Sequence, residues 1–349
     1  MKDNGRLLTG KAFARWCRFA LLATMWVSAA GAGDYADRAE ITEVISAAEA
    51  NGVDPLWAKN VLVSAERQQS ILDAIARPAE KTKPWYEYRA IFLTERRIRE
   101  GVAFWLEYKS VLDVVSQRTG VPAEVIVAII GVETFYGRIT GSYRVVDALA
   151  TLAFDYPKRS PFFTGELEAF LILAWESGKD PLTLKGSYAG AMGYGQFMPS
   201  SYRAYAKAFD GESAPDIWTD PADAISSVGN YLKVHGWRPG QPVVLGAQVH
   251  QPQSSLFDVG LKPAKSIEQL SALGIVATEP ADASVLATPL RLEVADGQAY
   301  WLGLQNFYAI TRYNHSAMYA MSVWQLSEAI AAGLVAATER GMDRVVSRD

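Results

Sequence analysis

Glu133 is the residue whose sequence surroundings most clearly favour chemistry. It follows residues 125–132, which are apolar apart from one glycine. A helix that is apolar on nearly every face is buried, and burial disfavours the ionised form of a carboxyl group. The last turn of a helix is also the negative end of its dipole, which acts in the same direction. We therefore expect a raised pKa for Glu133, as a general acid for a glycosidic oxygen requires. A buried glutamate that only binds backbone groups is the alternative.

Residues 185–202 form a glycine-rich segment with aromatic side chains between the glycines. The glycines allow the backbone to approach a ligand closely, and Ser187 and Gln196 offer neutral hydrogen-bonding groups. Flat aromatic faces for sugar rings come from Tyr188, Tyr194, Phe197 and Tyr202. A phosphate-binding loop is not indicated, because no lysine and hydroxyl residue follow the last glycine and no strand precedes the segment. Turns without a function are the alternative.

Residues 306–321 are dense in aromatic and amide side chains. Tyr313, Asn314 and Tyr319 could line a polysaccharide groove, and a well-packed edge of the core is the alternative.

The carboxylates of residues 210–223 suggest a calcium loop, but the match is poor. Alanine stands at position 208, where the first ligand is expected, and Ser213 replaces the glycine of the sharp turn.

Helical periodicity covers most of the chain and supplies the elements that must position these side chains. Thr94 is predicted to cap a helix that runs to about residue 115, and Pro122 begins the helix that carries Glu133. Further helices are predicted at residues 41–51, from 55, and at 147–154, 165–177, 200–209, 221–235 and 321–337, and a loop at 78–85. Short alternating runs within residues 241–305 predict a small antiparallel sheet, with one helix at 266–273.

The composition of the 349 residues is that of a globular protein, with 50% hydrophobic and 21% charged residues. The formal net charge of −4 argues against nucleic acid as a partner. One cysteine and three scattered histidines exclude an intrachain disulfide and argue against a zinc site.

The first 32 residues have the order of a secretory signal. Five basic side chains precede an apolar run, residues 19–32, that ends in small residues. This run is shorter than the roughly 20 residues that a membrane span needs, and an uncleaved anchor is the alternative. Cys17 precedes the run, so a lipoprotein is not expected. Cleavage would leave an acidic chain of formal charge −8 without cysteine, and we expect it in the periplasm.

Several segments in the same order resemble the B-type lytic murein transglycosylases, and the resemblance spans most of the chain. It is carried by residues 77–89, 129–137, 147–157, 185–202, 221–225 and 235–237, and by Tyr313-Asn314 with Tyr319.

This resemblance implies an α+β, mainly α fold, with a lysozyme-like catalytic core, an all-helical domain and a small inserted antiparallel β domain. The expected organisation is a signal peptide (1–32), the first part of the helical domain (33–115), the catalytic core (116–223), a helix returning to the helical domain (224–240), the β domain (241–305), and the second part of the helical domain with the groove lining (306–349).

The resemblance also implies roles for single residues. Glu133 matches the family's single acid/base, and Tyr319 is expected near it. Sugar-contacting positions are matched by Ser187, Gln196, Tyr231, Tyr313, Asn314, Tyr319, Tyr88 and Arg159. The family's calcium loop is matched in part, by Asp210, Glu212 and Asp223. Because Ala208 replaces a carboxylate, we expect calcium binding to be weakened or lost, and no cofactor to be required.

The implied reaction cleaves the bond between N-acetylmuramic acid and N-acetylglucosamine in peptidoglycan and leaves a 1,6-anhydro end. Ordinary glycosidases use two carboxylates, and the nearest second candidate, Asp155, precedes a turn as a capping aspartate does. A hydrolytic muramidase on the same scaffold and a non-catalytic wall-binding protein are the alternatives. Glycan strands are the expected partner, cell-wall synthases and other envelope proteins are further candidates, and membrane contact is expected only through an uncleaved leader.

Overall fold

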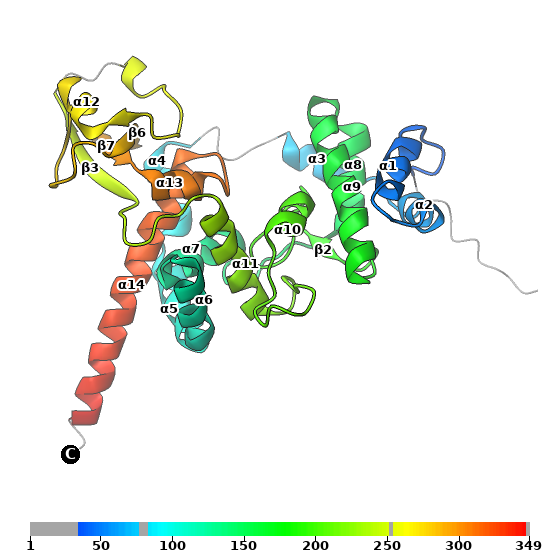
Figure 1. Cartoon of the computed structure of the whole chain (residues 1–349), viewed down its shortest axis with the longest axis horizontal. Coiled ribbons are helices and arrows are strands. Elements are labelled where there is room, and N and C mark those ends of the chain that lie inside the picture. Colours follow the sequence, from blue (N-terminus) through cyan, green and yellow to red (C-terminus); the bar gives the residue numbers. More distant parts are fainter. Residues whose placement is uncertain (1–33, 77–82, 251–253, 347–349) are drawn as a thin grey trace, which may run out of the picture. The chain divides into compact units, whose positions relative to one another are not determined.

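The helix that ends beside Glu133 lies at the centre of the packing. In the computed structural model, which describes residues 34–76, 83–250 and 254–346, this helix is α7 (Ala123–Thr134) (Figure 1). Ten of its twelve residues are buried, as its apolar sequence predicts. The predicted leader and most of the predicted loop at 78–85 lie outside the described residues.

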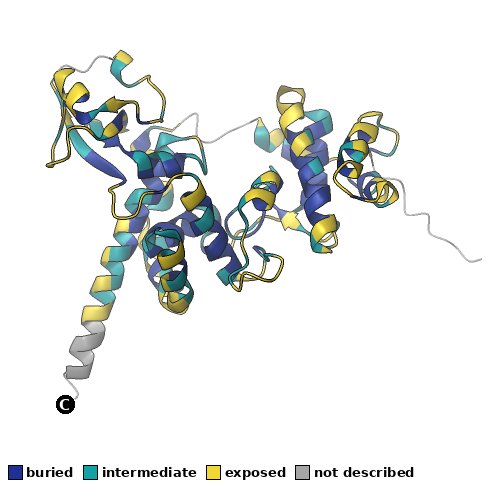
Figure 2. Ribbon diagram, viewed as in Figure 1, coloured by how far each residue is buried: buried dark blue, intermediate teal, exposed yellow. Residues whose placement is uncertain are grey.

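The remaining helices precede and follow α7 along the chain. Those before it are α1 (Glu40–Glu49), α2 (Pro55–Val63), α3 (Gln69–Ile75), α4 (Trp85–Phe92), α5 (Glu95–Glu107) and α6 (Lys109–Thr119). Those after it are α8 (Val145–Asp155), α9 (Ser160–Ser177), α10 (Pro199–Tyr205), α11 (Pro221–Val234), α12 (Ile267–Ala272), α13 (Gln305–Thr311) and α14 (Ala317–Val346). Figure 2 shows buried residues where neighbouring helices such as α8 and α9 face one another.

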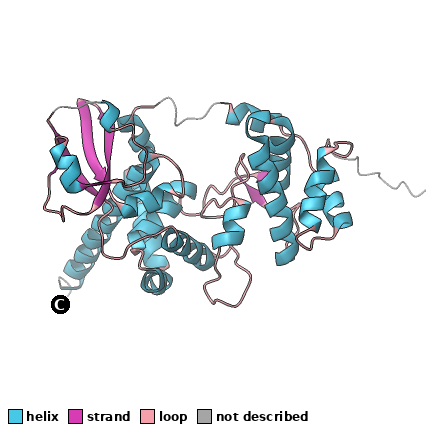
Figure 3. Ribbon diagram, turned by 45° about the horizontal axis from the view of Figure 1, so that its top comes forward, coloured by secondary structure: helices cyan, strands magenta, loops and turns pink. Residues whose placement is uncertain are grey.

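The predicted small sheet is present and antiparallel (Figure 3). Its strand order is β4-β6-β7-β3-β5, built from β3 (Val244–Val249), β4 (Lys265–Ser266), β5 (Ile275–Ala277), β6 (Leu286–Val294) and β7 (Gly297–Gly303). A separate antiparallel pair joins β1 (Tyr143–Arg144) to β2 (Lys185–Gly186), which begins the glycine-rich segment. The mainly helical fold with a small antiparallel sheet is thus confirmed.

Several helix predictions were wrong in extent. The helix predicted over 165–177 begins five residues earlier, at Ser160. The helix predicted from Thr94 to residue 115 is two helices that meet at Tyr108, because α5 packs on α7 and α14 whereas α6 packs on α11. The helix predicted over 200–209 ends at Tyr205. Beyond that point, two side chains of α11 accept hydrogen bonds from the backbone. Ser227 Oγ accepts the N–H of Lys207, and Asp223 Oδ1 accepts the N–H of Phe209.

α14 begins at Ala317, four residues before the predicted start, and packs against α4, α5, α7 and α13. Its residues 317–339 are long and apolar enough to cross a membrane, although only by length and composition. Core helices pass the same test, and the contacts of α14 with four helices identify it as a core helix.

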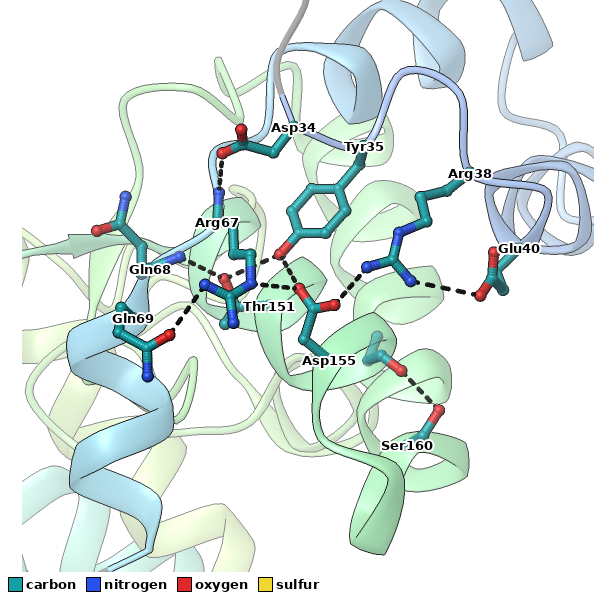
Figure 4. Close-up of polar contacts among 11 residues, drawn as sticks. Asp34, Tyr35, Arg38, Glu40, Arg67, Gln68, Gln69, Thr151, Asp155 and Ser160 are labelled. Carbon is teal, nitrogen blue, oxygen red and sulfur yellow. Dashed lines mark hydrogen bonds and ion pairs between the residues drawn. The ribbon is translucent and has the colours of Figure 1, made fainter.

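Asp155, at the end of α8, ties the first described residues to the helical core (Figure 4). Its Oδ2 accepts the Tyr35 hydroxyl at 2.8 Å and lies 3.2 Å from Arg67 Nε, and its Oδ1 pairs with Arg38. Both oxygens of this carboxylate are therefore engaged in holding the fold.

Replacing Asp155 with Ala is expected to lower the free energy of unfolding by about 2 kcal/mol. Removing one partner of a buried ion pair costs about 3–5 kcal/mol, but Arg38 and Arg67 are 37% and 40% exposed and would be solvated by water, which reduces the loss. Urea unfolding measures it, with Asp73→Ala on the exposed face of α3 as the control. Equal stability of the two variants would contradict the assigned role.

Candidate active site

The turn after α7 holds an unusual backbone conformation. Phe135 and Tyr136 have φ of +52° and +61°, and Gly137 follows at +84°. Among the described residues, Gln196 is the one other non-glycine residue with a positive φ, at +50°. Such conformations cost of the order of 1–3 kcal/mol each and cluster at functional sites. Both places of backbone strain therefore lie in the segments that the sequence singles out, beside Glu133 and within the glycine-rich segment.

Thr134 and Tyr136 hold this turn in place. The Thr134 hydroxyl donates to the Tyr194 carbonyl at 2.8 Å and accepts the Gly137 N–H at 2.9 Å. The Tyr136 hydroxyl donates to the Arg97 carbonyl at 2.8 Å. These bonds join the end of α7 to α5 and to the glycine-rich segment, so the position of Glu133 is set from both sides.

Glu133 is half-buried, and its carboxylate meets a tyrosine from the other end of the chain. The hydroxyl of Tyr319, in the first turn of α14, donates to Glu133 Oε1 at 2.6 Å. Burial, followed by the negative charge of Glu133, raises the pKa of Tyr319 well above its usual range. Tyr319 therefore keeps its proton and acts as a permanent donor to this carboxylate.

Tyr313 and Tyr231 form an aromatic wall with Phe197 next to this pair. The Tyr313 ring lies parallel to that of Tyr319 at 6.5 Å, and its centroid is 4.7 Å from that of Tyr231. The Tyr313 hydroxyl donates to the Gly195 carbonyl at 2.6 Å, and the Tyr231 hydroxyl donates to the carbonyl of Arg312, the residue before Tyr313. Burial raises the pKa of Tyr231 to about 12, so it stays neutral. Both hydroxyl groups are hydrogen-bonded to backbone carbonyls, so these residues contribute their rings, and not their hydroxyl groups, to the aromatic wall.

Ser187 and Gln196 both belong to the glycine-rich segment, and hydrogen bonds to the backbone hold both side chains. Gln196 Nε2 donates to the carbonyls of Thr140 and Gly193, at 3.1 and 3.0 Å, which leaves its Oε1 to accept. The Ser187 hydroxyl oxygen accepts two N–H groups of its own loop, which leaves its proton to donate.

Two further predicted positions are Tyr88 and Asn314. Tyr88 is buried on α4, which packs against α14, the helix that carries Tyr319. Asn314 follows Tyr313 in the turn between α13 and α14.

Arg159 directly precedes α9. It is exposed, with its guanidinium over the rings of Phe162 and Phe163 at 4.3 and 5.1 Å. Both rings belong to the first turn of α9, so Arg159 packs against the start of that helix. Its expected contact with a sugar stays a prediction.

Sequence reasoning missed Thr134 and Gly141. A Cβ at Gly141 would lie 2.0 Å from the Gly186 carbonyl oxygen and 2.4 Å from the Ser187 nitrogen, so only glycine fits beside this loop. The local sequence carries no signal for either role, because both depend on partners about 45 to 60 residues away.

Comparison with known proteins identifies the family of this chain. A family model described as a transglycosylase SLT domain matches residues 36–328. The chain belongs to this family. Membrane-bound lytic murein transglycosylase B of Escherichia coli strain K12 is 46% identical over 309 residues, which are 86% of this chain and 84% of that protein. The chain is thus an enzyme of the lytic transglycosylase class.

Two solved structures extend the comparison. Catenated lytic transglycosylase SltB1 of Pseudomonas aeruginosa superposes with a TM-score of 0.82 at 49% identity, covering 86% of this chain and all of that one. SltB3 of Pseudomonas aeruginosa, in complex with NAG-anhNAM-pentapeptide, superposes with a TM-score of 0.72 at 31% identity, covering 83% and 78%. The lysozyme-like fold class expected from the sequence is confirmed.

The calcium loop that the family resemblance implies is not matched by the residues present in this lytic transglycosylase. Asp223 is buried, and its two oxygens accept the N–H groups of Phe209 and Asp216, each at 2.7 Å. Asp210 Oδ1 accepts three hydrogen bonds from Glu212 and Ser213 of its own loop. Within the described residues, no group of three or more His, Cys, Asp or Glu side chains is arranged to hold a metal. The loop is closed by hydrogen bonds, so it does not fit a calcium site.

Calcium is therefore expected to leave the melting temperature unchanged within about 1 °C. Calcium at a concentration of 100 times its dissociation constant would stabilise the fold by about 2.7 kcal/mol. In a chain of this size, that stabilisation would raise the melting temperature by more than about 1 °C. Thermal unfolding in excess EDTA and in millimolar calcium measures the difference, with magnesium as the control. A saturable rise of the melting temperature with calcium alone would contradict the loss of the site.

Proposed function

We propose that this lytic transglycosylase cleaves the bond between N-acetylmuramic acid and N-acetylglucosamine in peptidoglycan glycan strands and leaves 1,6-anhydro-muramyl ends. The observation that carries the proposal is the half-buried Glu133 with the Tyr319 hydroxyl at 2.6 Å, beside an aromatic wall. The SLT domain and the murein transglycosylase name of the Escherichia coli relative support the substrate. The anhydro sugar in the name of the SltB3 complex supports the product.

The first step is protonation of the leaving oxygen by Glu133. The glycosidic bond then breaks, and the N-acetyl carbonyl oxygen of the muramyl sugar supports the positive charge that develops at C1. Glu133 is left as a carboxylate, and the hydrogen bond from Tyr319 stabilises that charge. The donor is in place before the reaction, so no reorganisation is needed when the charge appears.

The second step closes the anhydro ring. The Glu133 carboxylate takes the proton of the C6 hydroxyl of the same muramyl sugar, and O6 forms a bond to C1 as the N-acetyl oxygen withdraws. Glu133 is protonated again, the N-acetylglucosamine end carries the first proton, and no water is consumed. One carboxylate therefore serves as acid and then as base.

The engagement of other carboxylates supports a single-carboxylate reaction. Both oxygens of Asp155 bind Tyr35, Arg38 and Arg67. Asp223 binds two backbone N–H groups. Neither is available as the nucleophile or base that a hydrolytic glycosidase uses.

We also propose that the enzyme acts in the periplasm after export by its N-terminal signal. The basic and apolar order of residues 1–32 supports this location, as does a wall polymer as substrate.

Replacing Glu133 with Gln is expected to preserve the fold and to reduce turnover by about 10²–10⁴-fold, because an amide cannot supply the proton. Mass spectrometry of the muropeptides released from sacculi measures both rate and product, since an anhydro end lacks one water. Normal release of anhydromuropeptides by this variant would refute the assignment.

The same measurement separates the competing functions. Products of the unmodified enzyme that contain the extra water would indicate a hydrolytic muramidase. Binding to sacculi without soluble products would indicate a wall-binding protein.

Replacing Tyr319 with Phe is expected to lower kcat about tenfold and to move the alkaline limb of the kcat/KM profile to higher pH. The hydroxyl stabilises the ionised carboxylate. Without this donor Glu133 keeps its proton to higher pH, and the charge formed in the first step is less stabilised. Tyr300→Phe, in the small sheet, is the control. A fall in rate with an unmoved pH profile would mean that Tyr319 acts only through packing.

A further inference from the structure

A small cavity lies between α6, α11 and the segment that follows α10. Its volume is about 190 Å³, and it is lined by Val115, Arg118, Thr119, Lys207, Ala208, Ser226, Asn230 and Lys233. Ser226, Asn230 and Lys233 recur at intervals of four and three residues, so they share one face of α11. Tyr231 of the aromatic wall does not line the cavity, which is therefore distinct from the site around Glu133.

The lining is positively charged and lacks carboxylates, although the whole chain has a formal net charge of −4. Throughout the described ranges, Arg118, Lys207 and Lys233 form no ion pair with a carboxylate. Arg118 donates one N–H to the Phe209 carbonyl, and Lys233 donates one N–H to the Arg118 carbonyl. An arginine has five such donors and a lysine has three, so most donors of this cluster are not used within the protein.

Ser226 supplies a second, independent observation. It is only 7% exposed, and its hydroxyl has no hydrogen-bond partner within the described part of the chain. Buried hydroxyl groups are almost always paired, and an exception calls for an explanation such as an absent ligand. Its neighbour Ser227, by contrast, binds the backbone of Lys207. Ser226 lines the cavity. Because its hydroxyl oxygen is itself buried, a change of its side-chain rotamer is what brings the hydroxyl to a bound group.

Size and charge together select the ligand. Pockets for ligands of drug size measure about 300–1,000 Å³, so this cavity holds a small group and not a sugar ring. Three cations complement a group with two negative charges better than a single carboxylate. Arginine, lysine and a hydroxyl are the usual donors to phosphate oxygens. We propose that the cavity binds a phosphate group, either as the free ion or on a lipid headgroup.

Phosphate titration followed by calorimetry and thermal unfolding tests the site. The full chain without its leader is used, in low-salt buffer, with chloride at equal ionic strength as the reference. Saturable binding of inorganic phosphate is expected. Lys207→Ala is expected to raise the dissociation constant about fivefold, as the loss of one exposed charge pair does. This lysine is exposed and its side chain holds no part of the fold, so the variant is expected to fold normally.

Ser226→Ala distinguishes a ligand from a structural role. With no bond to lose, the variant is expected to have an unchanged melting temperature without phosphate. Its dissociation constant for phosphate is expected to rise several-fold, as the loss of one hydrogen bond implies. A lower melting temperature with unchanged phosphate affinity would show a structural hydroxyl and overturn the proposal.

Lys59→Ala, which removes an exposed charge from α2, is the matched control. If this variant lost as much phosphate affinity as Lys207→Ala, the loss would reflect only the net charge of the protein, and the proposal would be overturned. The absence of phosphate binding would also overturn it. Vesicles that contain phosphatidic acid, whose phosphomonoester can carry two negative charges, separate the sources of the group. Sedimentation with vesicles that Lys207→Ala abolishes would identify a lipid headgroup, whereas binding of phosphate without binding of vesicles would identify the free ion.

Discussion

The hydrogen bond from Tyr319 to Glu133 is the interaction on which the site depends. It joins the last turn of α7 to the first turn of α14, two helices that are 186 residues apart at this contact. Because Tyr319 is buried beside a negative charge, it keeps its proton and donates in one direction. The apolar surroundings of α7 favour the protonated carboxyl, whereas Tyr319 favours the carboxylate. This balance suits the role that we propose for Glu133, in which it gives up a proton and then takes one back.

The rest of the fold keeps these two side chains in register. The strained turn at Phe135 and Tyr136 persists because Thr134 and Tyr136 bind backbone groups of distant segments. The strained Gln196 is held in the same way by the carbonyls of Thr140 and Gly193. These hydrogen bonds therefore hold the backbone around Glu133 in one position, as a reaction that depends on precise geometry requires.

Two carboxylates of the chain, those of Asp155 and Asp223, stabilise the fold through hydrogen bonds and ion pairs. Asp155 binds two arginines and a tyrosine, and Asp223 closes the loop of residues 209–223 through backbone N–H groups. Hydrogen bonds of Asp210 and the ion pair of Asp216 with Lys179 also hold this loop, which follows alanine at position 208. Glu133 differs from Asp155 and Asp223 because its partner Tyr319 belongs to an aromatic wall.

The sequence by itself determined most of the helical elements and the small sheet, since these follow from periodicity. It also predicted Glu133 as the acid, from one carboxylate in an apolar run. The family resemblance added Tyr319, whose place beside Glu133 no local pattern reveals. Tertiary structure alone decided the break at Tyr108, the early end of α10 and the engagement of Asp155. Each of these depends on which partner a side chain or helix meets across the fold. Such partners are set by packing between segments distant in the chain, whereas periodicity reports only the face that a segment buries.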